Sequence, residues 1–194
     1  VAQGGQNVLG TKAELTSMCT AAEEMGIKVI VDVVSNHLAG GSSTSLNSNV
    51  KNYEPDIYNN NLIHTLGKFS SGDDAYTERV VKYAIGDFPD LQTENVTVQE
   101  RVLSLLKEYI DCGVDGFRFD AAKHIETPSD GDYASNYWAY ILKVGQPLGT
   151  FYGAVYDGVL QEGEEGTKGN YTYNQTAKAG DLCFLGEEKY LPFL

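Results

Sequence analysis

The sequence has little positive charge and no long apolar run. Of its 194 residues, 14 are Lys or Arg and 27 are Asp or Glu, which gives a formal net charge of −13 at pH 7. Binding to nucleic acid requires a basic surface, so we expect no nucleic-acid partner. The longest apolar runs, such as residues 29–34, are interrupted by charge and are far shorter than the ~20 residues of a membrane-spanning helix. We therefore expect no membrane partner either.

Cysteine is also scarce. Cys19, Cys112 and Cys183 are widely separated, which excludes a disulfide framework and offers no zinc-binding spacing. The first residues, 1–4, resemble neither an initiator segment nor a signal peptide, so we expect this chain to be part of a longer protein. Its acidic, Asn- and Tyr-rich composition favours an extracellular location.

The first third of the chain predicts a helix followed by a buried strand. Residues 11–14 form a Thr-x-x-Glu capping box, and apolar residues then recur at helical spacing over 12–25. Residues 27–34 are β-branched and nearly all apolar, which is typical of a strand buried on both faces of a parallel sheet. Residues 38–93 show no clear periodicity and are too many for an ordinary loop, so we interpret them as an inserted subdomain.

The second half predicts a similar alternation. A second capping box at 97–100 begins an amphipathic helix that ends at Gly113, although Asn95 beside it serves equally well as a helix cap or as part of a glycosylation sequon. The elements expected after it are a strand at 114–120, a helix at 132–144 and a strand at 149–155. The order predicts an α/β fold with a parallel sheet, divided into segments 1–37, 38–93, 94–155 and 156–194.

Two predicted strands end in polar and charged residues. Asn36 and His37 follow the first, and the second ends in Arg118-Phe119-Asp120. Carboxyl ends of parallel strands converge on the ligand site of such folds. Residues two apart share a strand face, so Arg118 can hold Asp120 ionised, as nucleophilic displacement at a sugar carbon requires. The alternative is an Arg–Asp ion pair that only orders the fold.

These segments carry a family resemblance. Val31 to His37 and Gly116 to His124 resemble the first two signature regions of α-amylases, in the large family of retaining glycosidases that act on α-glucans. The resemblance runs from about residue 7 to residue 155. It implies a (β/α)8 TIM barrel of which only the middle part, strands three to five, is present. Residues 38–93 would then be the family's inserted B domain, and the missing barrel segments would belong to the parent chain.

The resemblance also implies residue roles and an α-1,4-glucan substrate. Asp120 would be the catalytic nucleophile and Arg118 would orient it. His37, Lys123 and His124 would bind the sugar.

A calcium ion is the implied cofactor. Asn36 would bind it through its side-chain oxygen, His124 through its backbone carbonyl and Asp90 through its carboxylate, with Asp87 as a competing candidate for the acidic ligand. Carboxylate, amide and carbonyl oxygens are the ligands that calcium prefers.

One expected residue is missing. At the end of the fifth strand the family has a Gly-Glu pair whose Glu is the general acid/base, and this sequence has Gly153-Ala154. Ala cannot transfer a proton. The alternative is Gly186-Glu187, which would make Glu187 the acid/base after a long insertion. Two further functions remain open: a glucan-binding pseudoenzyme without the proton donor, and a related transglycosidase or debranching enzyme.

Overall fold

The computed structural model describes residues 10–70, 72–126, 130–141, 153–157 and 182–186. Its centre is a four-stranded sheet in the order β1-β2-β4-β3. The strands are β1 (Ile30–Val34), β2 (Gly116–Asp120), β3 (Gly153–Asp157) and β4 (Leu182–Gly186). In the described part of the chain no helix is long and apolar enough to span a membrane.

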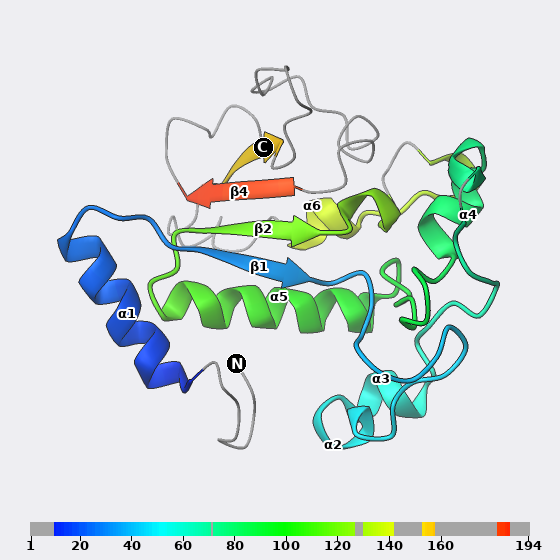
Figure 1. The fold of residues 1–194 in the computed structure, drawn as a ribbon, viewed down its shortest axis with the longest axis horizontal. Helices are drawn as coiled ribbons and strands as arrows, with labels where there is room; N and C mark the ends of the chain where they lie inside the picture. Colours follow the sequence, from blue (N-terminus) through cyan, green and yellow to red (C-terminus); the bar gives the residue numbers. More distant parts are fainter. Residues whose placement is uncertain (1–9, 71, 127–129, 142–152, 158–181, 187–194) are drawn as a thin grey trace.

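Two long helices accompany the sheet (Figure 1). The first, α1 (Lys12–Glu24), begins with the predicted capping box: the Thr11 side chain accepts a hydrogen bond from the Glu14 backbone, and the Glu14 carboxylate accepts one from the Thr11 backbone. The second, α5 (Val96–Asp111), begins one residue after Asn95, whose side chain accepts from the Thr97 backbone N–H at 2.9 Å. The capping box predicted at 97–100 is therefore wrong, and Asn95 caps this helix.

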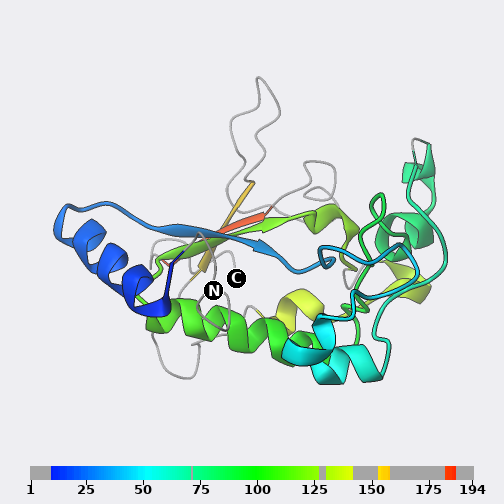
Figure 2. The same cartoon turned by 60° about the horizontal axis from the view of Figure 1, so that its bottom comes forward.

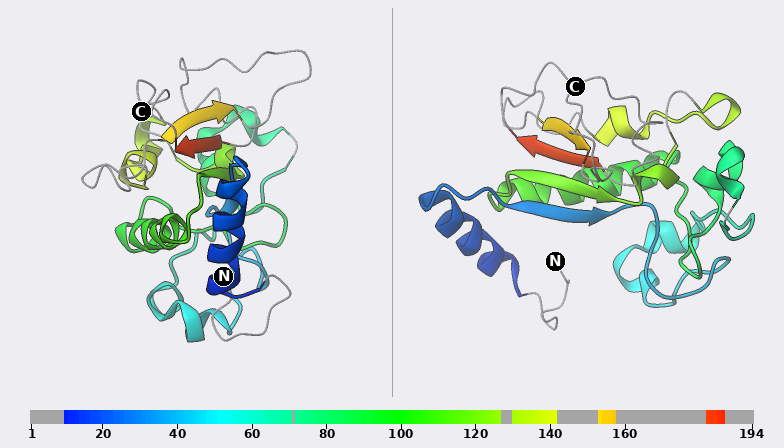
Figure 3. Two further views of the ribbon diagram at one scale, coloured as in Figure 1. Left: turned by 90° about the vertical axis from the view of Figure 1, so that its left-hand side faces the viewer. Right: turned by 45° about the horizontal axis from the view of Figure 1, so that its top comes forward.

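The sheet is parallel only in part. β1 and β2 run parallel, with Val34 opposite Asp120, whereas β4 pairs antiparallel with both β2 and β3. The antiparallel arrow of β4 between its neighbours is visible in Figure 3. Residues 149–155 were expected to continue a parallel sheet, and the strand there, β3, does run in the direction of β2. β4 occupies the apolar run before Glu187 that was the alternative position for the fifth strand, but its antiparallel direction was not expected.

The main core lies between the sheet and its helices. Figure 2 shows α5 and α6 (Tyr137–Ile141) on one side of β1 and β2. Phe117 and Phe119 point into this side and are 1% and 0% exposed, and Trp138 packs edge-on against Phe119 with ring centroids 5.3 Å apart. Burial of three large aromatic side chains fixes which face of β2 is turned inward.

The other face of β1 is open. Val33 is buried, but Ile30 and Val34 are 45% and 49% exposed, and Asp32 between them is exposed as well. The prediction that this strand is buried on both faces is therefore wrong for the described structure. Its inward face carries only Val31 and Val33, because residues alternate along a strand.

The insertion contains short helices joined by irregular chain, with no strand among its described residues beyond isolated bridges. The helices are α2 (Val50–Tyr53), α3 (Pro55–Asn59), η1 (Asp73–Ala75) and α4 (Thr77–Lys82). A second apolar cluster of Ile57, Leu62, Ile63, Leu91 and Val98 joins the insertion to the first turns of α5. The insertion therefore lies at the carboxyl ends of β1 and β2 (Figure 1). After β2 come the short helices η2 (Ala122–His124) and η3 (Gly131–Tyr133).

Candidate active site

The strand register brings the two predicted groups of polar residues to one edge. Val34 is opposite Asp120, so the chain that leaves β1 at Ser35 passes the end of β2. The Tyr137 hydroxyl donates to Ser35 Oγ at 2.6 Å, which ties this turn to α6. Asn36 and His37 follow beside Asp120, and Asp120 is half-buried at the end of its strand. The backbone therefore shows the predicted convergence of the two strand ends.

His37 is a neutral hydrogen-bonding group at this edge. Burial lowers its pKa, and the nearby charge of Asp120 opposes that effect only in part. Asn36 Nδ2 lies 3.4 Å from His37 Nδ1, so Nδ1 accepts and the ring proton resides on Nε2. The ring stacks on the half-exposed Phe88 with centroids 5.1 Å apart. A neutral imidazole held this way can donate Nε2–H to a hydroxyl group.

The positions of Arg118 and Asp120 agree with the predicted alternation. Phe117 and Phe119 are buried on the helix side and Asp120 is half-buried at the strand end, while the backbone of Arg118 is opposite Asp32 in the register. The side chains of Arg118 and Lys123 lie outside the part of the structure that is described, so their contacts stay predictions. Ala121 follows Asp120 with φ +55°, a left-handed conformation that is strained for a residue with a side chain and turns the chain sharply into η2.

A buried cluster next to this edge holds the insertion in place. Asn36 and Asp90 are each 1% exposed, and Asn36 Nδ2 donates to Asp90 Oδ1 at 2.9 Å. The backbone supports the pair, because the Leu91 N–H donates to the Asn36 carbonyl at 2.8 Å. Asp87 is largely exposed and pairs with Lys68 instead. Of the two acidic candidates for the calcium site, it is Asp90 that lies against Asn36.

The residues proposed to hold calcium suit that ion. Asn36 Oδ1 is buried and has no hydrogen-bond partner among the described residues. Burial raises the pKa of Asp90 to about 6, although hydrogen bonds from His64 and Asn36 act in the opposite direction. A buried amide oxygen without a donor and an incompletely compensated carboxylate are the two features that a bound cation would satisfy. The His124 carbonyl, in η2, stays a prediction as the third ligand.

His124 itself is mostly buried. Its Nδ1 donates to the Val80 carbonyl at 2.7 Å, and its ring packs edge-on against Phe69 with centroids 4.7 Å apart. These contacts fix η2 against α4 of the insertion. Sugar binding by the His124 side chain stays a prediction.

Deeper in the junction, His64 lies between two carboxylates. Its Nδ1 is 2.7 Å from Asp90 Oδ2 and its Nε2 is 3.0 Å from Glu94 Oε1. Burial lowers the pKa of His64, but the hydrogen bonds and charges of the two carboxylates outweigh burial and raise it to about 9. His64 is therefore a cation at neutral pH.

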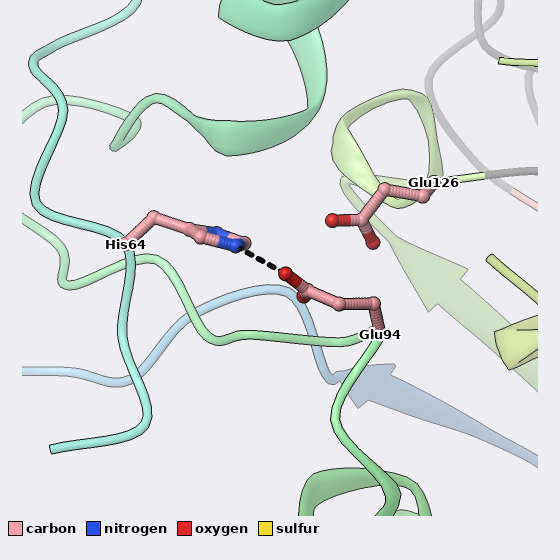
Figure 4. Close-up of side chains that lie close together, drawn as sticks. All are labelled: His64, Glu94 and Glu126. Carbon is pink, nitrogen blue, oxygen red and sulfur yellow. Dashed lines mark hydrogen bonds and ion pairs between the residues drawn. The ribbon is translucent and has the colours of Figure 1, made fainter. Parts of the chain in front are cut away.

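Glu126 completes this cluster from the other side. It is fully buried, accepts a hydrogen bond from the Thr93 hydroxyl and pairs with Lys82 at 3.2 Å. Burial and the charge of Glu94 raise the pKa of Glu126 to about 7. Burial alone would also raise the pKa of Glu94, but His64 and Lys82 lower it to about 2. Figure 4 shows His64, Glu94 and Glu126 converging from three separate segments.

Sequence reasoning left His64 unassigned and did not select Lys82, Glu94 or Glu126. Their spacing along the chain carries no motif, because they meet only when the insertion folds back onto the segment after β2. Ala154 lies in β3 opposite Leu185, whereas Glu187, the alternative acid/base, lies outside the described residues.

Comparison with known proteins identifies the family. The family model of the α-amylase catalytic domain matches residues 6–140. The chain therefore belongs to the α-amylase catalytic-domain family. It is 34% identical over 165 residues to an α-amylase of Clostridium acetobutylicum, covering 82% of this chain and 21% of that protein. It is 31% identical over 152 residues to a cyclomaltodextrin glucanotransferase of Bacillus licheniformis, covering 73% of this chain and 20% of that protein.

The structural comparison agrees with the predicted fold. An α-amylase from Geobacillus thermoleovorans, solved in complex with acarbose, matches with a TM-score of 0.55 and 21% identity, over 72% of this chain and 27% of the other. The expectation of part of a TIM-barrel catalytic domain is thereby confirmed. The chain spans about a fifth of the length of its relative from Clostridium.

Proposed function

We propose that this chain is the central part of the catalytic barrel of a retaining α-glucan hydrolase that cleaves internal α-1,4 bonds of starch-like polysaccharides. The supporting observation is the pairing of Val34 with Asp120, which places a half-buried carboxylate beside the neutral imidazole of His37 at the carboxyl ends of two parallel strands. We also propose that the parent protein is extracellular.

The proposed chemistry begins at Asp120. Its carboxylate attacks the anomeric carbon, the bond from that carbon to the glycosidic oxygen breaks, and the departing oxygen takes up a proton from water, since position 154 supplies no acid. Water then opens the glycosyl ester and restores Asp120. Arg118 orients the carboxylate, and His37 donates its Nε2–H to a hydroxyl of the sugar at the point of cleavage. Lys123 and His124 contact the sugar on the leaving-group side.

Calcium would be held by Asn36, Asp90 and the backbone carbonyl of His124. When bound, it would supply positive charge to the buried oxygens and tie the insertion to the barrel edge, without contacting the sugar. Asn36 and His37 are neighbours, so a fixed Asn36 also fixes the imidazole at the cleavage point.

The proton donor determines how active the chain is. The predicted acid/base position falls on Ala154, which has no ionisable group and which the strand register places level with Gly116, at the opposite end of β2 from Asp120. General acid/base catalysis contributes typically ~10²–10⁴-fold. We therefore expect slow release of reducing sugar from amylose by this chain. Asp120→Asn should abolish release, whereas Ala154→Glu should leave it unchanged, because position 154 lies at the opposite end of the sheet from Asp120. Unchanged hydrolysis by Asp120→Asn would refute the assignment of the nucleophile.

A second function follows from Ala154. A chain that keeps Asp120 and His37 but lacks a proton donor can bind α-glucans without cleaving them. Calorimetry would then show that maltooligosaccharides bind, while neither this chain nor Ala154→Glu releases reducing sugar. That pair of results would select the pseudoenzyme. Similarity to a glucanotransferase makes transglycosylation a third outcome, which product analysis on amylose and pullulan would reveal.

A further inference from the structure

The cluster of His64, Glu94 and Glu126 has the composition of a metal site. One ligand atom from each residue lies within 4.8 Å of the others. A histidine nitrogen and two carboxylate oxygens form a donor set that suits zinc and similar divalent ions better than calcium, which prefers oxygen alone. This cluster is separate from the oxygens of Asn36 that we assign to calcium.

A lysine ammonium already lies among these three ligand atoms. Lys82 Nζ is 2.8 Å from Glu94 Oε1, 3.2 Å from Glu126 Oε1 and 3.2 Å from His64 Nε2. The Lys82 side chain is only 14% exposed and Glu126 is fully buried, so the ammonium is largely withdrawn from water. A metal ion bound by these three atoms would have to occupy the same space.

The connectivity of Lys82 gives this contact a structural role. Lys82 is the last residue of α4, in the insertion, whereas Glu126 follows η2 and is two residues beyond His124. Glu94 lies between the insertion and α5. One ammonium therefore joins three segments that are far apart in the sequence, which is the role that structural metal ions have at such junctions.

We propose that the Lys82 ammonium is the resident cation of the His64–Glu94–Glu126 cluster, where it takes the place of a divalent metal and makes this part of the junction independent of metal. Removal of the ammonium should leave two carboxylates and the His64 imidazolium, whose Nε2 proton a bound metal ion would displace. Such a cluster should both weaken the junction and acquire affinity for zinc. The inference does not depend on catalysis. The cluster touches the proposed calcium site, since His64 Nδ1 lies 2.7 Å from Asp90 Oδ2, but it shares no ligand with that site.

Lys82→Met tests this inference, because Met keeps most of the stem and removes the charge. We expect its melting temperature in EDTA to fall below that of the wild type, and Zn²⁺ alone to raise it by roughly 5–10 °C at a hundredfold excess over the dissociation constant. Calorimetry should show one Zn²⁺ bound at least tenfold more tightly than by the wild type. Addition of His64→Gln to Lys82→Met should remove that gain.

Two controls are available in the chain. Lys82→Arg keeps a cation and should gain no zinc affinity. Lys68→Met removes a lysine from an exposed pair with Asp87 in the same insertion, and it should change neither the melting temperature in EDTA nor zinc binding.

Three results would overturn the proposal. One is equal zinc affinity in wild type and Lys82→Met, and another is an unchanged melting temperature of Lys82→Met in EDTA. The third needs no variant at position 82: Co²⁺ or Zn²⁺ bound by the wild type and lost in His64→Gln would show that the cluster holds metal despite Lys82.

Discussion

The charge on His64 should make the stability of the protein fall in mildly alkaline solution. Its pKa is 6.5 in an unfolded chain and about 9 in the folded protein, so the folded state binds the proton more tightly. A raised pKa of this kind contributes its full stabilisation below pH 6.5. That contribution is lost as the pH rises from 6.5 to about 9.

The magnitude follows from the two pKa values. At 1.36 kcal/mol per pKa unit, the whole shift corresponds to at most ~3 kcal/mol of unfolding free energy, and roughly 2–3 kcal/mol of it should disappear between pH 7 and pH 9. Above pH 7 Asp90 is already ionised, since its folded pKa is about 6, so it adds little slope in this window. Glu126, with a folded pKa of about 7, adds a smaller decline close to pH 7.

Urea unfolding in EDTA at pH 7, 8 and 9 measures how much the charge on His64 contributes to the unfolding free energy. We expect the unfolding free energy of the wild type to decline across the window and that of His64→Gln to be lower at pH 7 but nearly flat. His37→Gln is the matched control, because burial lowers the pKa of His37, in the opposite direction to the shift of His64. Parallel declines in wild type and His64→Gln would refute the charged state assigned to His64.

Three further outcomes are expected. Calcium at a hundredfold excess over its dissociation constant should stabilise the wild type by ~2.7 kcal/mol in thermal unfolding and should have little effect on Asn36→Ala; equal gains would exclude Asn36 as a ligand. Asn95→Ala should cost ~1 kcal/mol in urea, since it removes the cap of α5, and a neutral result would contradict that cap. The exposed face of β1 should promote association, so Ile30→Thr with Val34→Thr should lower light scattering. Met25→Gln should not, although Met25 is more exposed than either residue, because it lies outside this face.

Short sequence patterns correctly predicted the helix and strand features that depend on neighbouring residues. The Thr11 capping box and helical periodicity placed α1 within one residue of its observed end. The alternation in 116–120 correctly separated the buried Phe117 and Phe119 from the half-buried Asp120. The polar residues at the two strand ends predicted the convergence of His37 and Asp120, because parallel strands share an edge.

Long-range contacts account for what the sequence did not reveal. β4 lies in a stretch without periodicity, and only its pairing with β2 and β3 makes it a strand. The start of α5 was misplaced by two residues because Asn and Thr both cap helices well. Lys82 and Glu126 are 44 positions apart, so no spacing rule could connect them.

The most direct test of the central claim is the identity of the residue that attacks the sugar. A maltosyl fluoride donor suits this chain, because fluoride leaves without a proton and the reaction does not depend on a side chain at position 154. Mass spectrometry of the digested protein should find a maltosyl ester on the peptide that contains Asp120, and none in Asp120→Asn. A maltosyl ester on a different carboxylate, or none at all in a chain shown by calorimetry to bind maltooligosaccharides, would contradict the claim.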